Sequence, residues 1–247
     1  MPGRKGFTLV EVLVTALVLS LFLGAAYSMF FGGQKVAGKA AWLQYVVTDL
    51  RKAEMVITKA IEATSYPTTL LPSDMYDAGG RDQATIGPNA TKFYVHIPQG
   101  LGRKTAADIL GANNGISMYM PRALPERQKF STAENRSGIL GWNIFKLETS
   151  PDNPTQGTLV WEERETTYAT VAPNYAEALA AAPMTAPLKR REILVRNVDW
   201  IEIQAENIGH KPQKITIVIS AAYPREPRTT RQGTSAAVPN VGITTSP

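Results

Sequence analysis

A run of 25 residues near the N-terminus, FTLVEVLVTALVLSLFLGAAYSMFF at positions 7–31, is apolar except for one charged residue, Glu11. As an α-helix it would be roughly 37 Å long, which exceeds the roughly 30 Å hydrocarbon core of a bilayer. Arg4 and Lys5 precede the run, and basic residues tend to stay on the cytoplasmic side of a membrane. The sequence therefore predicts one transmembrane helix, with residues 1–6 in the cytoplasm and everything after Phe31 on the outer side.

Glu11 requires an explanation, because a carboxylate inside a membrane segment costs on the order of a few kcal/mol. A cut between Gly6 and Phe7 would supply one. The new α-amino group of Phe7 would lie about one helical turn from Glu11. In a bundle of such helices, Glu11 of one chain could pair with the amine of its neighbour, and the pair would set the register of assembly.

The residues at this position also carry a family resemblance. The stretch RKGFTLVEVLVTALV resembles the leader and cleavage region of type IV prepilins and type II secretion pseudopilins, in which a short basic leader ends in glycine. Gly6, Phe7 and Glu11 match the three characteristic positions of that family. The resemblance implies cleavage after Gly6 by a prepilin peptidase, N-methylation of Phe7, and assembly guided by Glu11. It also implies an inner-membrane precursor that meets an assembly platform and other pilin or pseudopilin subunits.

Two other interpretations of the N-terminus remain. The first is an ordinary secretory signal peptide, with residues 13–23 as its apolar region and small residues 24–26 as the cleavage site. The second is an uncut single-pass anchor. N-terminal sequencing separates all three, because a signal peptide gives a start at Tyr27 and an anchor retains Met1.

A helical pattern continues beyond the apolar run. Apolar residues recur at spacings of three and four along one face: Trp42, Val46, Leu50, Ala53, Ile57 and Ile61. We expect one helix over residues 7–63, roughly 85 Å long, whose half 32–63 is amphipathic and covers a globular domain. A separate core helix would show the same stripe. Glycine lowers helix stability, so we expect bending or local melting at Gly24, Gly32, Gly33 and Gly38.

The remaining chain alternates with the period of two that is typical of strands. After a predicted loop over residues 64–90, we expect strands at 92–98, 116–120, 140–148, 158–165, 192–206 and 214–223, with the 140–148 and 158–165 strands joined as a hairpin. A phase change in the apolar positions predicts a β-bulge near 198–201, and residues 207–212 are expected to form a polar turn. The predicted fold is α+β: a long N-terminal helix packed on an antiparallel sheet, with an extracytoplasmic domain over residues 64–223.

A second resemblance concerns the subtype. LQYVVTDLRKA on the helix, and ILVRNVDWIEIQAEN followed by KITIVISAAY, are similar to the corresponding regions of J-type minor pseudopilins and W-type minor pilins. This implies a minor subunit. Two stretches extend that pattern: a Tyr/Ala/Pro-rich insertion at 167–188, expected to be a surface loop or a short helix at 174–182, and a tail at 224–247 that is rich in Ser, Thr and Pro. We expect the tail to be disordered.

The sequence offers little for catalysis or cofactor binding. It has no cysteine, and its two histidines, His96 and His210, lack metal-ligand spacing. Asp74, Asp77 and Asp82 are weak candidates for a calcium ion, because their spacing fits no EF-hand and aspartates beside Gly79-Gly80 are ordinary turn residues. The run 162–165 (EERE) is expected to be a solvated face. We therefore expect no cofactor, and a substrate of a peptidase rather than an enzyme.

The net charge of +5, falling to +3 once Arg4 and Lys5 are removed, is too small and scattered to predict nucleic-acid binding. The leading function is a minor pilin or pseudopilin that joins or primes a type IV pilus or a type II secretion pseudopilus. The alternative is a filament-tip subunit for DNA uptake or adhesion, for which Trp142, Trp161 and Trp200 are candidate contact residues.

Overall fold

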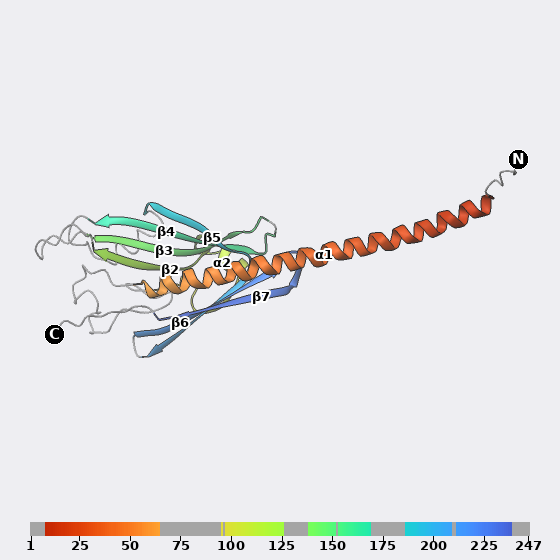
Figure 1. The fold of residues 1–247 in the computed structure, drawn as a ribbon. Coiled ribbons are helices and arrows are strands. Elements are labelled where there is room, and N and C mark those ends of the chain that lie inside the picture. Colours follow the sequence, from red (N-terminus) through yellow and green to blue (C-terminus); the bar gives the residue numbers. More distant parts are fainter. Residues whose placement is uncertain are drawn as a thin grey trace, which may run out of the picture. The chain divides into compact units, whose positions relative to one another are not determined.

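The computed structural model describes residues 8–64, 95, 97–125, 138–151, 153–168, 186–208 and 211–238. The chain divides into two compact units, Met1–Tyr45 and Val46–Pro247, and each is described by itself. Helix α1 (Leu9–Glu62) begins in the first unit and ends in the second (Figure 1). Its 54 residues confirm the predicted long N-terminal helix.

The helix is continuous through all four of its glycines, so the predicted local melting is wrong. Gly24, Gly32 and Gly33 have open space where a side chain would be, so within this chain no packing contact requires a glycine there. Residues 8–38 of the first unit are exposed throughout. The helix is therefore held by its own backbone hydrogen bonds, which good helix formers such as leucine and alanine support.

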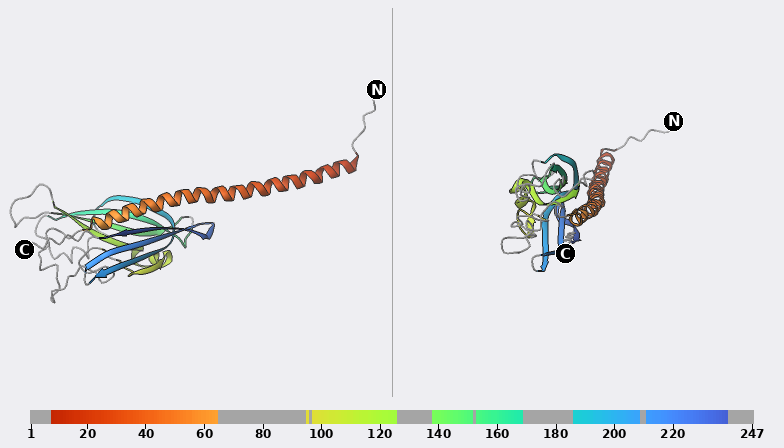
Figure 2. Two further views of the ribbon diagram at one scale, coloured as in Figure 1. Left: turned by 60° about the horizontal axis from the view of Figure 1, so that its bottom comes forward. Right: turned by 90° about the vertical axis from the view of Figure 1, so that its left-hand side faces the viewer.

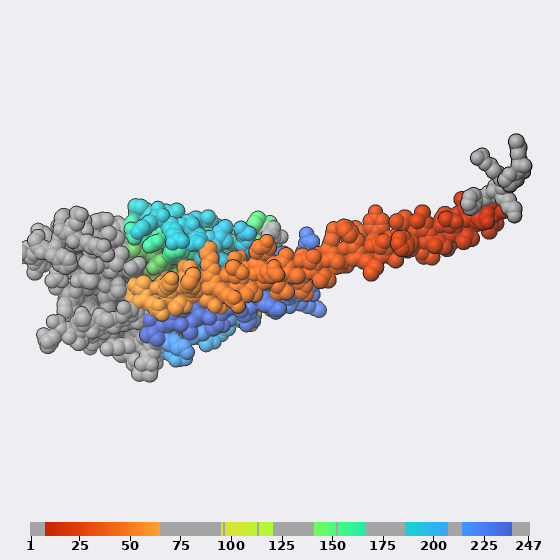
Figure 3. All heavy atoms as spheres, viewed as in Figure 1, coloured from red at the N-terminus to blue at the C-terminus, as the bar shows by residue number. Residues whose placement is uncertain are grey.

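In the second unit, one face of α1 is buried against the sheet. Val46, Leu50, Ala53, Ile57 and Ile61 are all at most 4% exposed, as their spacing predicts, and Ala60 joins them. Each large apolar side chain buried in this way stabilises the fold by about 1.5–3 kcal/mol. In the space-filling view, this part of α1 lies between strands β4 and β5 on one side and β6 and β7 on the other (Figure 3).

The sheet has seven strands in the described residues, and all the pairings are antiparallel. Six strands follow the order β2-β3-β4-β5-β6-β7, and β1 pairs with β5. Their bounds are β1 (Gly102–Thr105), β2 (Ile116–Pro125), β3 (Gly138–Thr149), β4 (Gly157–Tyr168), β5 (Leu188–Ile208), β6 (Lys211–Tyr223) and β7 (Glu226–Ala237). A short helix, α2 (Ala106–Leu110), and a 3-10 turn (Asn113–Gly115) separate β1 from β2. The predicted α+β architecture and the β3–β4 hairpin are confirmed.

Strand β5 joins the two halves of the sheet. Its first half pairs with β4 and its second half with β1 and β6. The register shifts between Val198 and Trp200, which confirms the predicted bulge. Asn197 lies beside it with a φ of 57°, in the left-handed region that asparagine tolerates better than most residues. The phase change in the sequence therefore marks the point where β5 passes from one set of partners to the other.

The predicted disordered tail is wrong over half of its length, because residues 226–237 form strand β7. This strand pairs with β6 and runs alongside the second half of α1 (Figures 1 and 2). Gly233 lies against the helix: a Cβ there would be 2.7 Å from Glu54 Oε1 and 3.1 Å from Leu50 Cβ. Glu54 Oε1 also accepts a hydrogen bond from the Thr234 backbone N–H at 3.0 Å. The composition of this segment, rich in small and polar residues, predicted disorder, but the same small residues leave room for α1 to pack on β7.

Two further predictions change. Val95, Ile97 and Pro98 carry no strand pairing, although Val95 and Ile97 are fully buried, and burial explains the alternation that suggested a strand there. The turn predicted at 207–212 is shorter, because β5 continues to Ile208 and β6 starts at Lys211. Strand β1 and helix α2 were not predicted. The loop 64–90 and the insertion 167–188 lie mostly outside the described residues.

Candidate assembly site

The first turn of α1 is built around Glu11. Its Oε2 accepts hydrogen bonds from the Thr8 backbone N–H at 2.8 Å and from the Thr8 hydroxyl at 3.0 Å. In return, the Thr8 hydroxyl oxygen accepts from the Glu11 backbone N–H at 3.3 Å. This reciprocal pair is a capping box, which satisfies donors that a helix N-terminus otherwise leaves free. Glu11 therefore has a structural role within its own chain.

The surface beyond Glu11 is apolar and uncovered. Large apolar side chains from Leu9 to Phe31 are about half to four-fifths exposed. Near the end of this stretch, the Tyr27 and Phe31 rings stack with centroids 6.1 Å apart, and Phe30 meets Phe31 edge-on at the same distance. Among the described residues, α1 alone is long and apolar enough to cross a membrane. Such a surface needs lipid or other helices around it.

The comparisons with known proteins concern this same stretch. The model of the prokaryotic N-terminal methylation motif matches residues 1–27. The chain carries a prepilin-type N-terminus. The motif is typical of type IV prepilins and pseudopilins, which are structural subunits processed by a prepilin peptidase and are not enzymes. No curated protein and no solved structure matches the chain.

Several residues singled out in the sequence lie outside the described part of this prepilin-type chain. They are Gly6 and Phe7 at the expected cut, the calcium candidates Asp74, Asp77 and Asp82, and both histidines, His96 and His210. In the part that the structure describes, no group of three His, Cys, Asp or Glu side chains could hold a metal ion. Of the three assembly residues, only Glu11 can be placed.

The run 162–165 is not the solvated face that we expected. The Glu162 side chain is 4% exposed and pairs with Lys146 on β3 and with Arg164, whose Nη2 lies 2.8 Å from Glu162 Oε2. Burial by itself raises the pKa of the Glu162 carboxyl, but hydrogen bonds from Lys146 and Arg164, together with their charges, hold that pKa below its usual value. Glu162 is charged and buried because both cations reach it from neighbouring positions of the sheet.

The three candidate tryptophans do not form an exposed row. Trp142 is fully buried, and Trp200 is 7% exposed with the Arg103 guanidinium 3.8 Å from its ring centre. Only Trp161 is partly exposed; it donates from Nε1 to Asn143 Oδ1 at 3.0 Å, and Arg190 lies over its ring at 4.9 Å. Single-strand DNA binding needs successive stacking platforms, which these residues do not provide.

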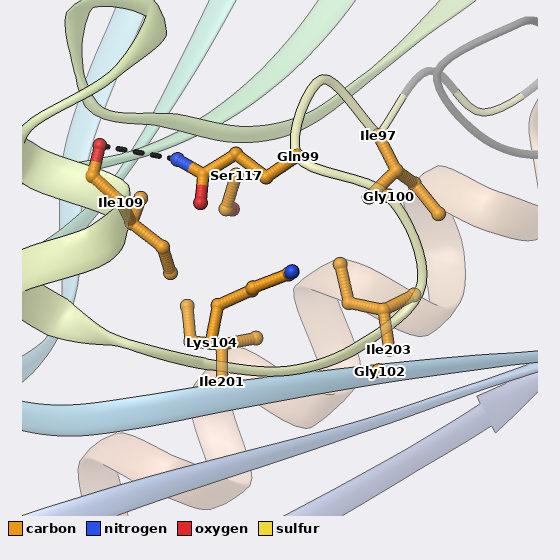
Figure 4. A pocket seen from close by; sticks show the side chains of 9 residues that line it. All are labelled: Ile97, Gln99, Gly100, Gly102, Lys104, Ile109, Ser117, Ile201 and Ile203. Carbon is orange, nitrogen blue, oxygen red and sulfur yellow. Dashed lines mark hydrogen bonds between the residues drawn. The ribbon is translucent and has the colours of Figure 1, made fainter.

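The described residues of the second unit line a groove and a small cavity. A groove of about 410 Å³ runs between the last turns of α1 and strands β3 to β5, with Trp161, Glu163 and Arg190 on its sheet side. A cavity of about 10 Å³ lies between β1, α2 and the loop before β1, where Gln99 Nε2 donates to the Ile109 carbonyl at 3.3 Å (Figure 4). That volume is about one water molecule, too small for an organic ligand.

Sequence reasoning missed the capping role of Glu11, although a signal was present. Thr8-Leu9-Val10-Glu11 has the S/T-x-x-E spacing of a capping box. The same signal precedes α2, where Thr105 and Asp108 form a second capping box. Hydrogen bonds from the Thr105 hydroxyl and backbone hold the pKa of Asp108 below its usual value. Both helix starts were therefore readable from the sequence.

Proposed function

We propose that this prepilin-type chain is a minor pilin or pseudopilin, cleaved between Gly6 and Phe7, N-methylated on Phe7 and assembled into a type IV pilus or a secretion pseudopilus. The observation that carries the proposal is the match of the methylation motif to residues 1–27. Its support from the fold is a continuous helix, α1, whose apolar first part is exposed throughout.

Glu11 is proposed to guide assembly. Among the described residues, Thr8 supplies the two hydrogen bonds that the Glu11 carboxylate accepts. In a filament, the α-amino group of Phe7 from a neighbouring subunit would add the opposite charge. An ion pair in a low-dielectric bundle is far stronger than in water, so a mismatched register that leaves Glu11 unpaired would be strongly disfavoured.

The minor-subunit assignment rests on the resemblance of the helix and of strands β5 and β6 to J-type pseudopilins and W-type minor pilins. The alternative, a filament-tip subunit for DNA uptake or adhesion, uses the same helix. The support for this alternative is limited to Trp161 and Arg190 in the groove beside α1. Glu163 lines the same groove, and its negative charge would repel a phosphate backbone.

N-terminal sequencing and intact mass of the protein from cells with and without a prepilin peptidase test the processing step. We expect a methylated Phe7 start only when the peptidase is present. Glu11→Gln should be cleaved and inserted normally but should be depleted from sheared filaments by at least tenfold. Thr8→Val, which removes the hydroxyl and keeps the backbone N–H, is the matched control for the capping contribution. A start at Tyr27, or normal incorporation of Glu11→Gln, contradicts the proposal.

A further inference from the structure

The β6–β7 hairpin has a tip that differs from the rest of the sheet. In the second half of β7, Gly233, Ser235 and Ala237 are buried in alternation, whereas none of residues 226–232 is buried. The pairing is also irregular there, because Tyr223 pairs with Glu226 but Ala222 already pairs with Thr230. The tip therefore projects beyond the core of the second unit and is not held by packing on both faces.

The exposed charge on this tip is mostly positive. Arg225, Arg228 and Arg231 are all exposed. None of the three makes an ion pair with the described residues, and Arg231 donates only to the Thr230 carbonyl at 3.3 Å. Glu226 is the one acidic residue among them. Pro224 and Pro227 fix φ on either side of Arg225, so the tip is stiff as well as charged.

The tip lies at the end of the unit where α1 enters it. Gly233 lies against Leu50 and Glu54, and β7 runs alongside α1 in the same direction (Figure 1). Going back from Glu54 to Val46 covers about 12 Å of helix, and going back from Thr234 to Arg228 covers about 20 Å of strand. Gln156, in the β3–β4 turn, donates to the Ala222 carbonyl at 3.2 Å, which places that turn at the same end.

A short stretch of chain connects this end of the second unit to the apolar segment. Residues 32–45 separate Phe31 from the second unit, and as a helix they span about 21 Å. Two more cations, Lys35 and Lys39, lie in this stretch. The tip therefore lies at the end of the second unit that the chain connects, through residues 32–45, to the apolar segment.

We propose that the arginine tip, Arg225, Arg228 and Arg231, binds the anionic phospholipid headgroups of the leaflet from which α1 emerges. Arginine matches phosphate oxygens with two parallel N–H donors and holds its charge at any pH. Each basic residue near an anionic surface strengthens membrane contact about fivefold. The inference rests on the proposed membrane insertion of α1. It assigns the tip a role before assembly: it orients the sheet unit on the membrane surface until the subunit is extracted into a filament.

The chain has no cysteine, so one added cysteine gives a unique label. The full chain carrying Thr229→Cys with a fluorophore is reconstituted in nanodiscs that contain a headgroup-attached quencher. The lipid is either phosphatidylcholine alone or phosphatidylcholine with one third phosphatidylglycerol. We expect stronger quenching in the anionic discs, reversed by salt. A label at Gln204→Cys on β5 should show no difference, because its partner Thr216 on β6 lies roughly 23 Å along the strand from the tip.

The double variant Arg225→Gln/Arg228→Gln should lower the equilibrium ratio of membrane-bound to unbound tip about 25-fold in anionic discs. Arg225→Lys/Arg228→Lys should retain most of the response. The control Lys59→Gln/Lys214→Gln removes the same charge from exposed positions elsewhere and should leave quenching unchanged. Equal quenching in the two lipids, or an equal loss in the control, overturns the proposal.

Two further outcomes also overturn it, and they identify what failed. If the arginine variant is depleted from filaments without any lipid-dependent quenching, the partner is an acidic surface of a neighbouring subunit. If the unmodified chain does not enter nanodiscs at all, the membrane anchoring by α1 fails, and the lipid inference falls with it.

Discussion

The Glu162 carboxylate, which the sequence placed on a solvated face, is buried in the sheet. Glu162 is buried between Lys146 and Arg164, so replacing it removes the one carboxylate that both cations contact, although Lys146 keeps Glu148 and Arg164 keeps the Ala186 carbonyl. Glu162→Gln should lower the free energy of unfolding by about 2 kcal/mol, which for a unit of this size lowers Tm by about 4–8 °C. Circular dichroism melts of the full chain in detergent measure this change in Tm. The control is Glu163→Gln, on the opposite face, which should stay within about 0.5 kcal/mol of the unchanged chain.

The pH dependence follows from the same residue. Glu162 has a lowered pKa in the folded chain, so the unfolded chain binds the proton more readily. Its contribution to stability is present above the ordinary glutamate value of 4.5 and is lost as pH falls through the lower folded value. Glu148, whose pKa is lowered by contacts with Arg191 and Lys146, acts in the same direction. Between pH 6 and pH 3, Glu162→Gln should therefore lose less Tm than the unchanged chain; an identical slope would contradict the assignment.

At the scale of elements, β7 and α1 depend on each other. Gly233 leaves room for Leu50 and for the Glu54 carboxylate, which caps the Thr234 amide at the outer edge of β7. Gly233→Ala should displace Glu54 and cost about 1–3 kcal/mol, measured by the same melts. Gln232→Ala, one residue away and exposed, should change Tm little. Equal melting of both variants would mean that β7 tolerates a side chain beneath the helix.

The outer edge of β7 affects solubility, because a free strand edge can pair with other chains. An uncovered outer strand offers free N–H and C=O groups to other chains. Glu54 satisfies one of these amides from α1. The arginines along the remaining part of the strand oppose edge-to-edge pairing by charge, which is compatible with their proposed contact with lipid.

At the scale of the whole molecule, Glu11 and Glu162 lie in different units. Glu11 contacts Thr8 in the first unit, and Glu162 contacts Lys146 and Arg164 in the second. Sites without shared contacts have additive effects within about 0.5 kcal/mol. The double variant Glu11→Gln/Glu162→Gln should therefore melt like Glu162→Gln and assemble like Glu11→Gln. Melting that differs from Glu162→Gln by more than this margin would reveal coupling between assembly and the sheet.

The local patterns in the sequence determined α1, the stripe from Val46 to Ile61, the β3–β4 hairpin and the bulge in β5. These follow from periodicity, which is set by backbone geometry within a few residues. The prepilin-type motif and its lone glutamate were equally visible, because they depend on spacing along one helix.

Only the tertiary structure decided which face of a strand contacts other strands or the helix. Glu162 is buried because Lys146 on the next strand and Arg164 reach it, and a sequence does not show cross-strand neighbours. Residues 226–237 have the composition of a disordered tail, yet β6 offers them a free edge and α1 covers Gly233. Pairing and burial of this kind depend on elements that are far apart in the chain. They place residues 226–237 in the sheet and bring the three arginines together at the tip of the β6–β7 hairpin.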